Sequence, residues 1–80
     1  MKIYIKPWCP WCIAALQWLR QHEITHESID VLSDAAAFAR MRQISKQSLT
    51  PTLELPDGSV LPDFDTKQLE SFLRKHHLFP

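Results

Sequence analysis

The chain has 80 residues, nine of them Lys or Arg and nine Asp or Glu, so its formal net charge is zero. This length predicts one domain, residues 1–80, because domains rarely contain fewer than about 50 residues. The balanced charge argues against nucleic-acid partners, which are attracted by a broad positive field. No apolar run approaches the roughly 20 residues that span a bilayer, and no leader-like apolar segment follows Met1. We therefore expect a cytoplasmic monomer with no membrane partner.

The first part of the chain predicts a strand, a helix and a second strand. Lys2–Lys6 contains β-branched and aromatic residues in an alternating pattern, which is typical of a strand. Apolar residues recur at intervals of three within Cys12–His22, starting at Ile13, and predict the first helix. Pro10 suits its first turn, where a missing N–H group loses no hydrogen bond. Thr25–Asp30 is expected to form the second strand.

The rest of the chain predicts a helix, a hairpin and a last helix. Ser33 or Asp34 can cap the second helix, and residues 52–61 contain two short apolar runs around a turn, which predicts a β-hairpin. Asp63 or Asp65 can cap the last helix, which has an apolar stripe. The order is β-α-β-α-β-β-α. We expect an α/β fold in which three helices flank a four-stranded mixed sheet, because a strand-helix-strand unit is parallel and a hairpin is antiparallel.

Residues with redox chemistry are concentrated at Cys9-Pro10-Trp11-Cys12. At the start of a helix, the first sulfur lies beside unpaired amide groups and the positive end of the helix dipole, and both favour the thiolate. We therefore expect Cys9 to be the nucleophile. Cys12, about one turn later and less exposed, can close a disulfide with Cys9 and act as the resolving thiol. Lys6, three residues before Cys9, can favour the thiolate or bind an anionic ligand.

A Cys-x-x-Cys pair also forms half of many zinc sites. The chain has only these two cysteines, and the only His pair with ligand spacing, His22 and His26, is expected near the opposite end of the first helix. The sequence thus favours redox chemistry over a metal site or inert buried cysteines. It predicts no tightly bound metal or organic cofactor.

These residues resemble the dithiol glutaredoxins, a branch of the thioredoxin fold, over nearly the whole chain. The resemblance rests on Lys6, on the Cys-Pro-aromatic-Cys motif with Trp11 in the aromatic position, and on Thr50-Pro51 before the third strand. It implies a cis peptide bond at Pro51 and backbone hydrogen bonds from Thr50 to the cysteinyl part of glutathione. It also places Lys6 and Trp11 in the glutathione site.

The resemblance extends to the start of the last helix, with one departure. Glutaredoxins usually have a Gly-Gly pair there, which grips the γ-glutamyl end of glutathione, whereas this chain has Pro62-Asp63. Glycine allows a close approach of the backbone, so Pro62 and Asp63 reshape this side of the groove. Asp65 is still expected to bind the α-ammonium group, and the helix start at Thr66 is expected to bind the carboxylate.

The resemblance implies a glutathione-dependent thiol-disulfide oxidoreductase that reduces protein disulfides or glutathione mixed disulfides. Its expected partners are glutathione, as co-substrate, and disulfide-containing or glutathionylated proteins. Trp8 and Trp11, beside Cys9, can form an apolar docking surface for such proteins. Two alternatives remain open: a disulfide reductase recharged by a thioredoxin reductase, and a module that binds glutathione or an iron–sulfur cluster.

Overall fold

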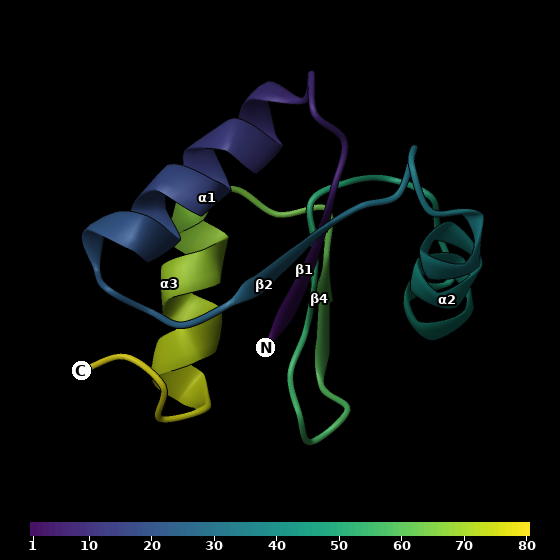
Figure 1. Ribbon diagram of the computed structural model, residues 1–80. Coiled ribbons are helices and arrows are strands. Elements are labelled where there is room, and N and C mark those ends of the chain that lie inside the picture. The colour runs from purple at the N-terminus through teal and green to yellow at the C-terminus, as the bar shows by residue number, and fades with distance from the viewer.

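The computed structural model of the protein describes residues 1–80 and contains four strands and three helices. The element order is the one predicted from the sequence. The first helix begins at Pro10, which the sequence analysis placed in its first turn, whereas the second strand begins later than expected, at Glu27. The elements are β1 (Lys2–Ile5), α1 (Pro10–Gln21), β2 (Glu27–Asp30), α2 (Ala35–Ser45), β3 (Thr52–Glu54), β4 (Val60–Pro62) and α3 (Thr66–Lys75) (Figure 1).

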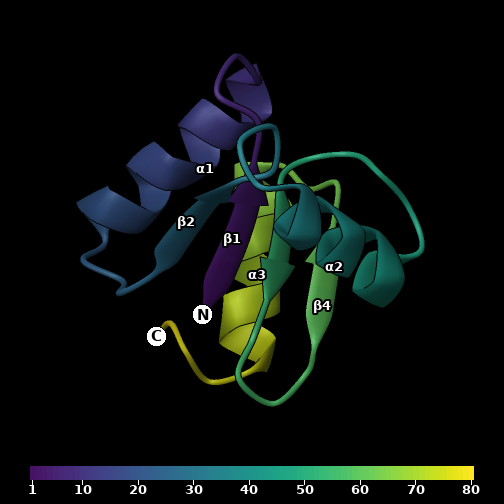
Figure 2. The same ribbon diagram turned by 45° about the vertical axis from the view of Figure 1, so that its right-hand side comes forward.

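The strands form one mixed sheet in the order β2-β1-β3-β4. β1 is parallel to β2 and antiparallel to β3, and β3 is antiparallel to β4. Helices α1 and α3 lie side by side on one face of the sheet, and α2 covers the other (Figures 1 and 2). The predicted α/β fold, a four-stranded mixed sheet flanked by three helices, is confirmed.

Successive residues of β1 direct their side chains to opposite faces of the sheet and so belong to two apolar clusters. Ile3 lies in the larger cluster, which fills the space between the sheet, α1 and α3. Tyr4 lies in the smaller cluster, beneath α2, with Val31 and Met41. Each fully buried aliphatic side chain contributes about 1.5–3 kcal/mol to folding. The larger cluster comprises Ile3, Ala15, Leu19, Leu53, Leu55, Phe64, Leu69 and Leu73.

Ile13 is a correction to the apolar face predicted for the first helix. Its side chain is 48% exposed, whereas the buried residues of α1 are Cys12, Ala15 and Leu19. Successive helical residues are about 100° apart around the axis, so Ile13 lies well to one side of the stripe that contains Cys12. The three-residue spacing from Ile13 therefore identified the helix but not its buried face.

Side-chain caps determine where α2 and α3 begin. Of the alternatives open in the sequence, Asp34 caps α2 by accepting a hydrogen bond from the Ala37 amide at 3.0 Å. Asp65, rather than Asp63, caps α3. No helix of the protein is long and apolar enough to cross a membrane.

Candidate active site

The two cysteines lie where the loop after β1 enters α1. Cys9 is the N-cap residue of α1, and its sulfur accepts a hydrogen bond from the Cys12 amide at an N–S distance of 3.3 Å. Pro10 occupies the first helical turn, where its lack of an N–H group has no effect on the helix. Both cysteines are free thiols. The sulfur of Cys9 thus takes the capping position that a serine or aspartate oxygen fills in most helices.

The surroundings of Cys9 favour its thiolate. Burial alone would raise the pKa of Cys9, but hydrogen bonds outweigh burial and the net effect is a lowered pKa. These hydrogen bonds come from the thiol and amide of Cys12, the side chain of Thr50 and the amide of Trp11. Cys9 therefore has the electronic character of a nucleophilic cysteine.

Cys12 has the opposite character. Burial is the main reason that its pKa is raised to about 11, and its hydrogen bond to Cys9 and the negative charge on Cys9 raise it further. Its side chain is completely buried, while Cys9 retains 5% exposure. The two sulfurs therefore differ in both acidity and access, as the order of the motif predicts.

Thr50 and Pro51 lie beside Cys9, in the loop before β3. The Thr50–Pro51 peptide bond is cis, in line with the family resemblance. The carbonyl oxygen of Thr50 accepts a hydrogen bond from the Cys9 thiol at 3.7 Å, while the side chain of Thr50 lowers the Cys9 pKa. The amide of Thr50 has no acceptor within the protein. Thr50 thus has backbone groups next to the reactive sulfur, and its side-chain contact with Cys9 was not anticipated from the sequence.

Lys6 is close to Cys9 in sequence, but its ammonium group binds the backbone of Ser48. Its ammonium nitrogen donates to the Ser48 carbonyl oxygen at 3.2 Å and lies 5.9 Å from the ring centroid of Trp8 and 5.6 Å from that of Phe38. The groups that lower the Cys9 pKa are Cys12, Thr50 and Trp11. Lys6 is not among the groups that lower the Cys9 pKa, and its second predicted role, the binding of an anionic ligand, stays a prediction.

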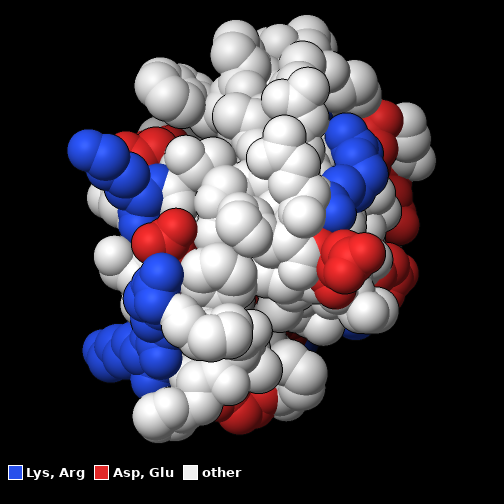
Figure 3. Space-filling view, turned by 90° about the vertical axis from the view of Figure 1, so that its left-hand side faces the viewer, with Lys and Arg blue, Asp and Glu red and all other residues white.

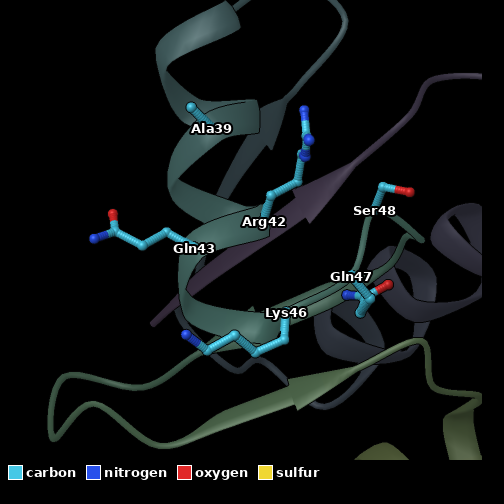
Figure 4. A pocket seen from close by; sticks show the side chains of 6 residues that line it. All are labelled: Ala39, Arg42, Gln43, Lys46, Gln47 and Ser48. Carbon is cyan, nitrogen blue, oxygen red and sulfur yellow. The ribbon is translucent and has the colours of Figure 1, made fainter.

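A surface hollow of about 610 Å³ lies next to Ser48, along α2 and the loop that follows it. Arg42 and Lys46 are its charged residues, and Figure 4 shows Arg42 on the side of α2 that faces Ser48, with Gln43 on the other side. Because Lys6 donates to the Ser48 carbonyl oxygen, a third positive charge lies beside the hollow. The hollow is lined by Ala39, Arg42, Gln43, Lys46, Gln47 and Ser48.

At the start of α3, hydrogen bonds within the helix terminus occupy part of the polar groups that the sequence analysis assigned to glutathione. Asp65 Oδ1 accepts from the Gln68 amide at 2.8 Å, and Gln68 Oε1 accepts from the Asp65 amide at 2.9 Å. This capping box leaves only the second carboxylate oxygen of Asp65 without a partner. The Asp-x-x-Gln spacing was a readable signal for it. Asp63 has the left-handed φ of 48°, which favours glycine, and its amide donates to Pro51 O at 2.8 Å.

An apolar area surrounds the entrance to Cys9. Trp8 and Trp11 are 68% and 61% exposed, and Ile13 and Leu49 are also among the exposed large apolar residues. On the face shown in Figure 3, no charged side chain lies at the upper end of the molecule, where the loop between β1 and α1 is found. Such an apolar area suits contact with another molecule. We name Trp8, Trp11, Ile13 and Leu49 the apolar rim.

The structure brings most of the sequence-predicted site residues to one end of the sheet. Lys6, Cys9 and Cys12 come from the loop after β1 and from α1, and Thr50 with Pro51 comes from the loop before β3. The start of α3 is joined to them through the bond from Asp63 to Pro51. No group of three or more His, Cys, Asp or Glu side chains is placed to hold a metal ion.

Comparison with known proteins agrees with this arrangement. Residues 1–60 match the family model Glutaredoxin. The chain is 31% identical over 75 residues to an uncharacterized glutaredoxin-like 8.6 kDa protein in the rubredoxin operon of Clostridium pasteurianum, covering 94% of this chain and 99% of that protein.

Solved structures extend the comparison to the fold. The crystal structure of the thioredoxin-like protein BC3987 is 32% identical, with a TM-score of 0.80 over 90% of this chain and 97% of that one. A point mutant of BC3987 gives a TM-score of 0.81 at the same identity, over 90% of this chain and 96% of that one. Fold and family together support a thiol redox function. The chain belongs to the glutaredoxin family and has a thioredoxin-like fold.

Proposed function

We propose that this protein is a glutathione-dependent thiol-disulfide oxidoreductase, in which Cys9 is the nucleophile and Cys12 the resolving thiol. The observation that carries the proposal is the opposed acidity of the two sulfurs. The pKa of Cys9 is lowered at the N-terminus of α1, whereas that of Cys12 is raised to about 11. Cys9 is therefore the sulfur that can attack as a thiolate, whereas Cys12 stays protonated in the resting reduced protein.

In the first step the Cys9 thiolate attacks one sulfur of a substrate disulfide. A new S–S bond forms to Cys9, the substrate S–S bond breaks, and the departing thiolate takes a proton from water. Cys12 then loses its proton and attacks Cys9, which closes the Cys9–Cys12 disulfide and releases the second substrate thiol. Removal of the Cys9 negative charge in the first step lowers the pKa of Cys12, because that charge is one cause of its raised value.

Glutathione returns the electrons. One glutathione thiolate attacks the Cys9–Cys12 disulfide, and a second attacks the resulting mixed disulfide, which gives oxidised glutathione and the reduced protein. Alternatively, a glutathione thiolate attacks the mixed disulfide that Cys9 forms with the substrate in the first step. Cys12 is not required on this route. Loss of Cys9 should therefore abolish turnover with a glutathione mixed disulfide, while loss of Cys12 should not.

The proposed glutathione site is built around the Thr50 amide and the second carboxylate oxygen of Asp65, neither of which has a partner within the protein. The free amide and the carbonyl of Thr50 suit the cysteinyl backbone, and Lys6 provides positive charge for a carboxylate. The free carboxylate oxygen of Asp65 suits the α-ammonium group, and the start of α3 at Thr66 suits the γ-glutamyl carboxylate. Trp11 and the rest of the apolar rim would contact the apolar surface around a protein disulfide.

A second candidate function is favoured by the start of α3. Pro62 has no N–H group, the Asp63 amide is bonded to Pro51, and the Asp65 amide is bonded to Gln68. Few donors remain there for a γ-glutamyl carboxylate. In this alternative the same two cysteines reduce disulfides, and a thioredoxin reductase supplies the electrons.

Two turnover assays, one with a small glutathione mixed disulfide and one with a protein disulfide, separate the two candidates. One assay supplies glutathione, glutathione reductase and NADPH, and a parallel assay supplies thioredoxin reductase and NADPH with a protein disulfide. Turnover in the first assay that is absent in Cys9→Ser and persists in Cys12→Ser supports glutathione as donor. Turnover in the second assay alone supports the alternative, and inactivity in both contradicts thiol-disulfide exchange.

A further inference from the structure

The loop that carries Thr50 is held by side chains of its own neighbours. Gln47 donates from its amide nitrogen to Thr52 Oγ1 at 3.0 Å and to Ser45 Oγ at 2.8 Å. Thr52 is completely buried, yet every buried side-chain polar atom of the protein has a hydrogen-bond partner. The buried hydroxyl is thus part of a complete network between the end of α2 and the start of β3.

This network fixes the backbone immediately before Thr50. Thr52 Oγ1 donates to the Leu49 carbonyl oxygen at 2.9 Å, and the Gln47 side-chain oxygen accepts from the Leu49 amide. The side chain of Leu49 is 54% exposed. Leu49 is therefore anchored by both of its backbone polar groups rather than by burial of its side chain.

The bond to Leu49 also sets the direction of the Thr50 amide. The Leu49 carbonyl and the Thr50 N–H belong to one peptide group, which is planar and trans, so fixing the oxygen fixes the N–H on its opposite side. That N–H has no acceptor within the protein. The hydroxyl of Thr52 and the amide of Gln47 thus control a free donor beside Cys9 without touching the sulfur themselves.

We propose that Gln47 and Thr52 are positioning residues of the redox site, which hold the Leu49–Thr50 peptide group so that Thr50 faces Cys9 and the incoming disulfide. The inference rests on the proposed attack by Cys9, but not on which donor supplies the electrons. Loosening the network displaces two things: the Thr50 side chain that favours the Cys9 thiolate, and the Thr50 amide that would bind substrate.

The test compares isosteric and conservative variants. Thr52→Val keeps the shape and removes the hydroxyl, Thr52→Ser keeps the hydroxyl, and Gln47→Met removes the amide. Gln43→Met is the matched control, because it makes the same chemical change on the other side of α2, at a side chain that has no hydrogen bond. Each variant is checked for folding by circular dichroism. The readouts are the pH profile of Cys9 alkylation by iodoacetamide, and KM and kcat for a glutathione mixed disulfide.

We expect Thr52→Val and Gln47→Met to move the alkylation profile to higher pH and to raise KM by about three- to tenfold, with a smaller change in kcat. Thr52→Ser and Gln43→Met should behave as the unaltered protein. Folded Thr52→Val and Gln47→Met variants with unchanged profiles and unchanged KM would overturn the inference. If Thr52→Val does not fold, Gln47→Met decides by the same criteria, because Gln47 lies outside the buried core.

The alkylation profile needs neither glutathione nor a reductase. An unaltered protein that fails to turn over glutathione substrates would therefore contradict the proposed electron donor, while the profiles of the variants still support or overturn the positioning role.

Discussion

The amide nitrogen of Cys12 lies 3.3 Å from the sulfur of Cys9, so α1 begins at a hydrogen bond to sulfur. The same contact caps the helix and favours the Cys9 thiolate. Stability and reactivity therefore depend on one atom, and they respond differently to substitution. Replacing sulfur by oxygen should preserve the cap and remove the chemistry.

Cys9→Ser is expected to be at least as stable as the unaltered reduced protein, because serine is among the best N-cap residues. Cys9→Ala, which has no acceptor, should lower the free energy of unfolding by about 0.5–2 kcal/mol. Urea denaturation of the reduced proteins measures both. Equal stability of the serine and alanine variants would show that the sulfur does not cap α1.

The raised pKa of Cys12 makes the stability of the reduced protein depend on pH. A folded-state pKa of about 11 lies above the unfolded value of about 8.5, so the folded state holds the Cys12 proton more tightly. The resulting stabilisation is present below about pH 8.5 and is lost as pH rises toward about 11. Urea denaturation between these limits should show a steeper loss of stability than in Cys12→Ala, in which this group is absent. Parallel curves for the two proteins would contradict the assignment.

Asp65 is expected both to cap α3 and to bind the α-ammonium group of glutathione, and one pair of variants separates these two roles. Asp65→Ala removes the cap of α3 and should lower the free energy of unfolding by about 1 kcal/mol. Asp65→Asn keeps an oxygen acceptor for the Gln68 amide, so the helix should remain stable, but the charge for the α-ammonium group is lost. Its KM for a glutathione mixed disulfide should rise several-fold. An Asp65→Asn variant with unchanged KM would remove Asp65 from the proposed glutathione site.

Glu54 stabilises the opposite face of the sheet through two partners of different exposure. Its carboxylate accepts from the buried Tyr4 hydroxyl at 2.7 Å and from the exposed Arg40 side chain at 2.8 Å. Burial and the contact with Glu54 raise the pKa of Tyr4 to about 12. Glu54→Ala should therefore cost about 1–3 kcal/mol, because it leaves a buried hydroxyl unpaired.

Arg40→Ala provides the comparison for Glu54. It removes only an exposed ion-pair partner and should cost less than about 1 kcal/mol. Chemical denaturation gives both values. Similar losses in the two variants would mean that the Tyr4 hydroxyl contributes nothing beyond the surface ion pair.

The sequence predicted the features that local chemistry determines. The order of the elements followed from alternation and spacing, and the motif Cys9–Cys12 indicated which sulfur would be the more acidic. The cap of the last helix was narrowed to Asp63 or Asp65, and only the structure shows that Asp65 binds the amide three positions away. Ile13 was placed wrongly because spacing reveals a helix more readily than the direction from which the sheet approaches it.

The remaining features depend on contacts between segments far apart in the chain. The side chain of Thr50 meets Cys9 only because the sheet brings β3 beside β1. Lys6 is drawn to the Ser48 carbonyl instead of the sulfur for the same reason. Neither contact leaves a periodic or spacing signal in the sequence, since each is set by loop geometry.

The difference in acidity between the two thiols can be measured by brief treatment of the reduced protein with iodoacetamide at a series of pH values, with mass spectrometry of each cysteine. We expect that Cys9 alone reacts near neutral pH, with a midpoint below the free value of about 8.5, while Cys12 stays unmodified until strongly alkaline pH. Equal reactivity of the two thiols, or a Cys9 midpoint at or above the free value, would contradict it.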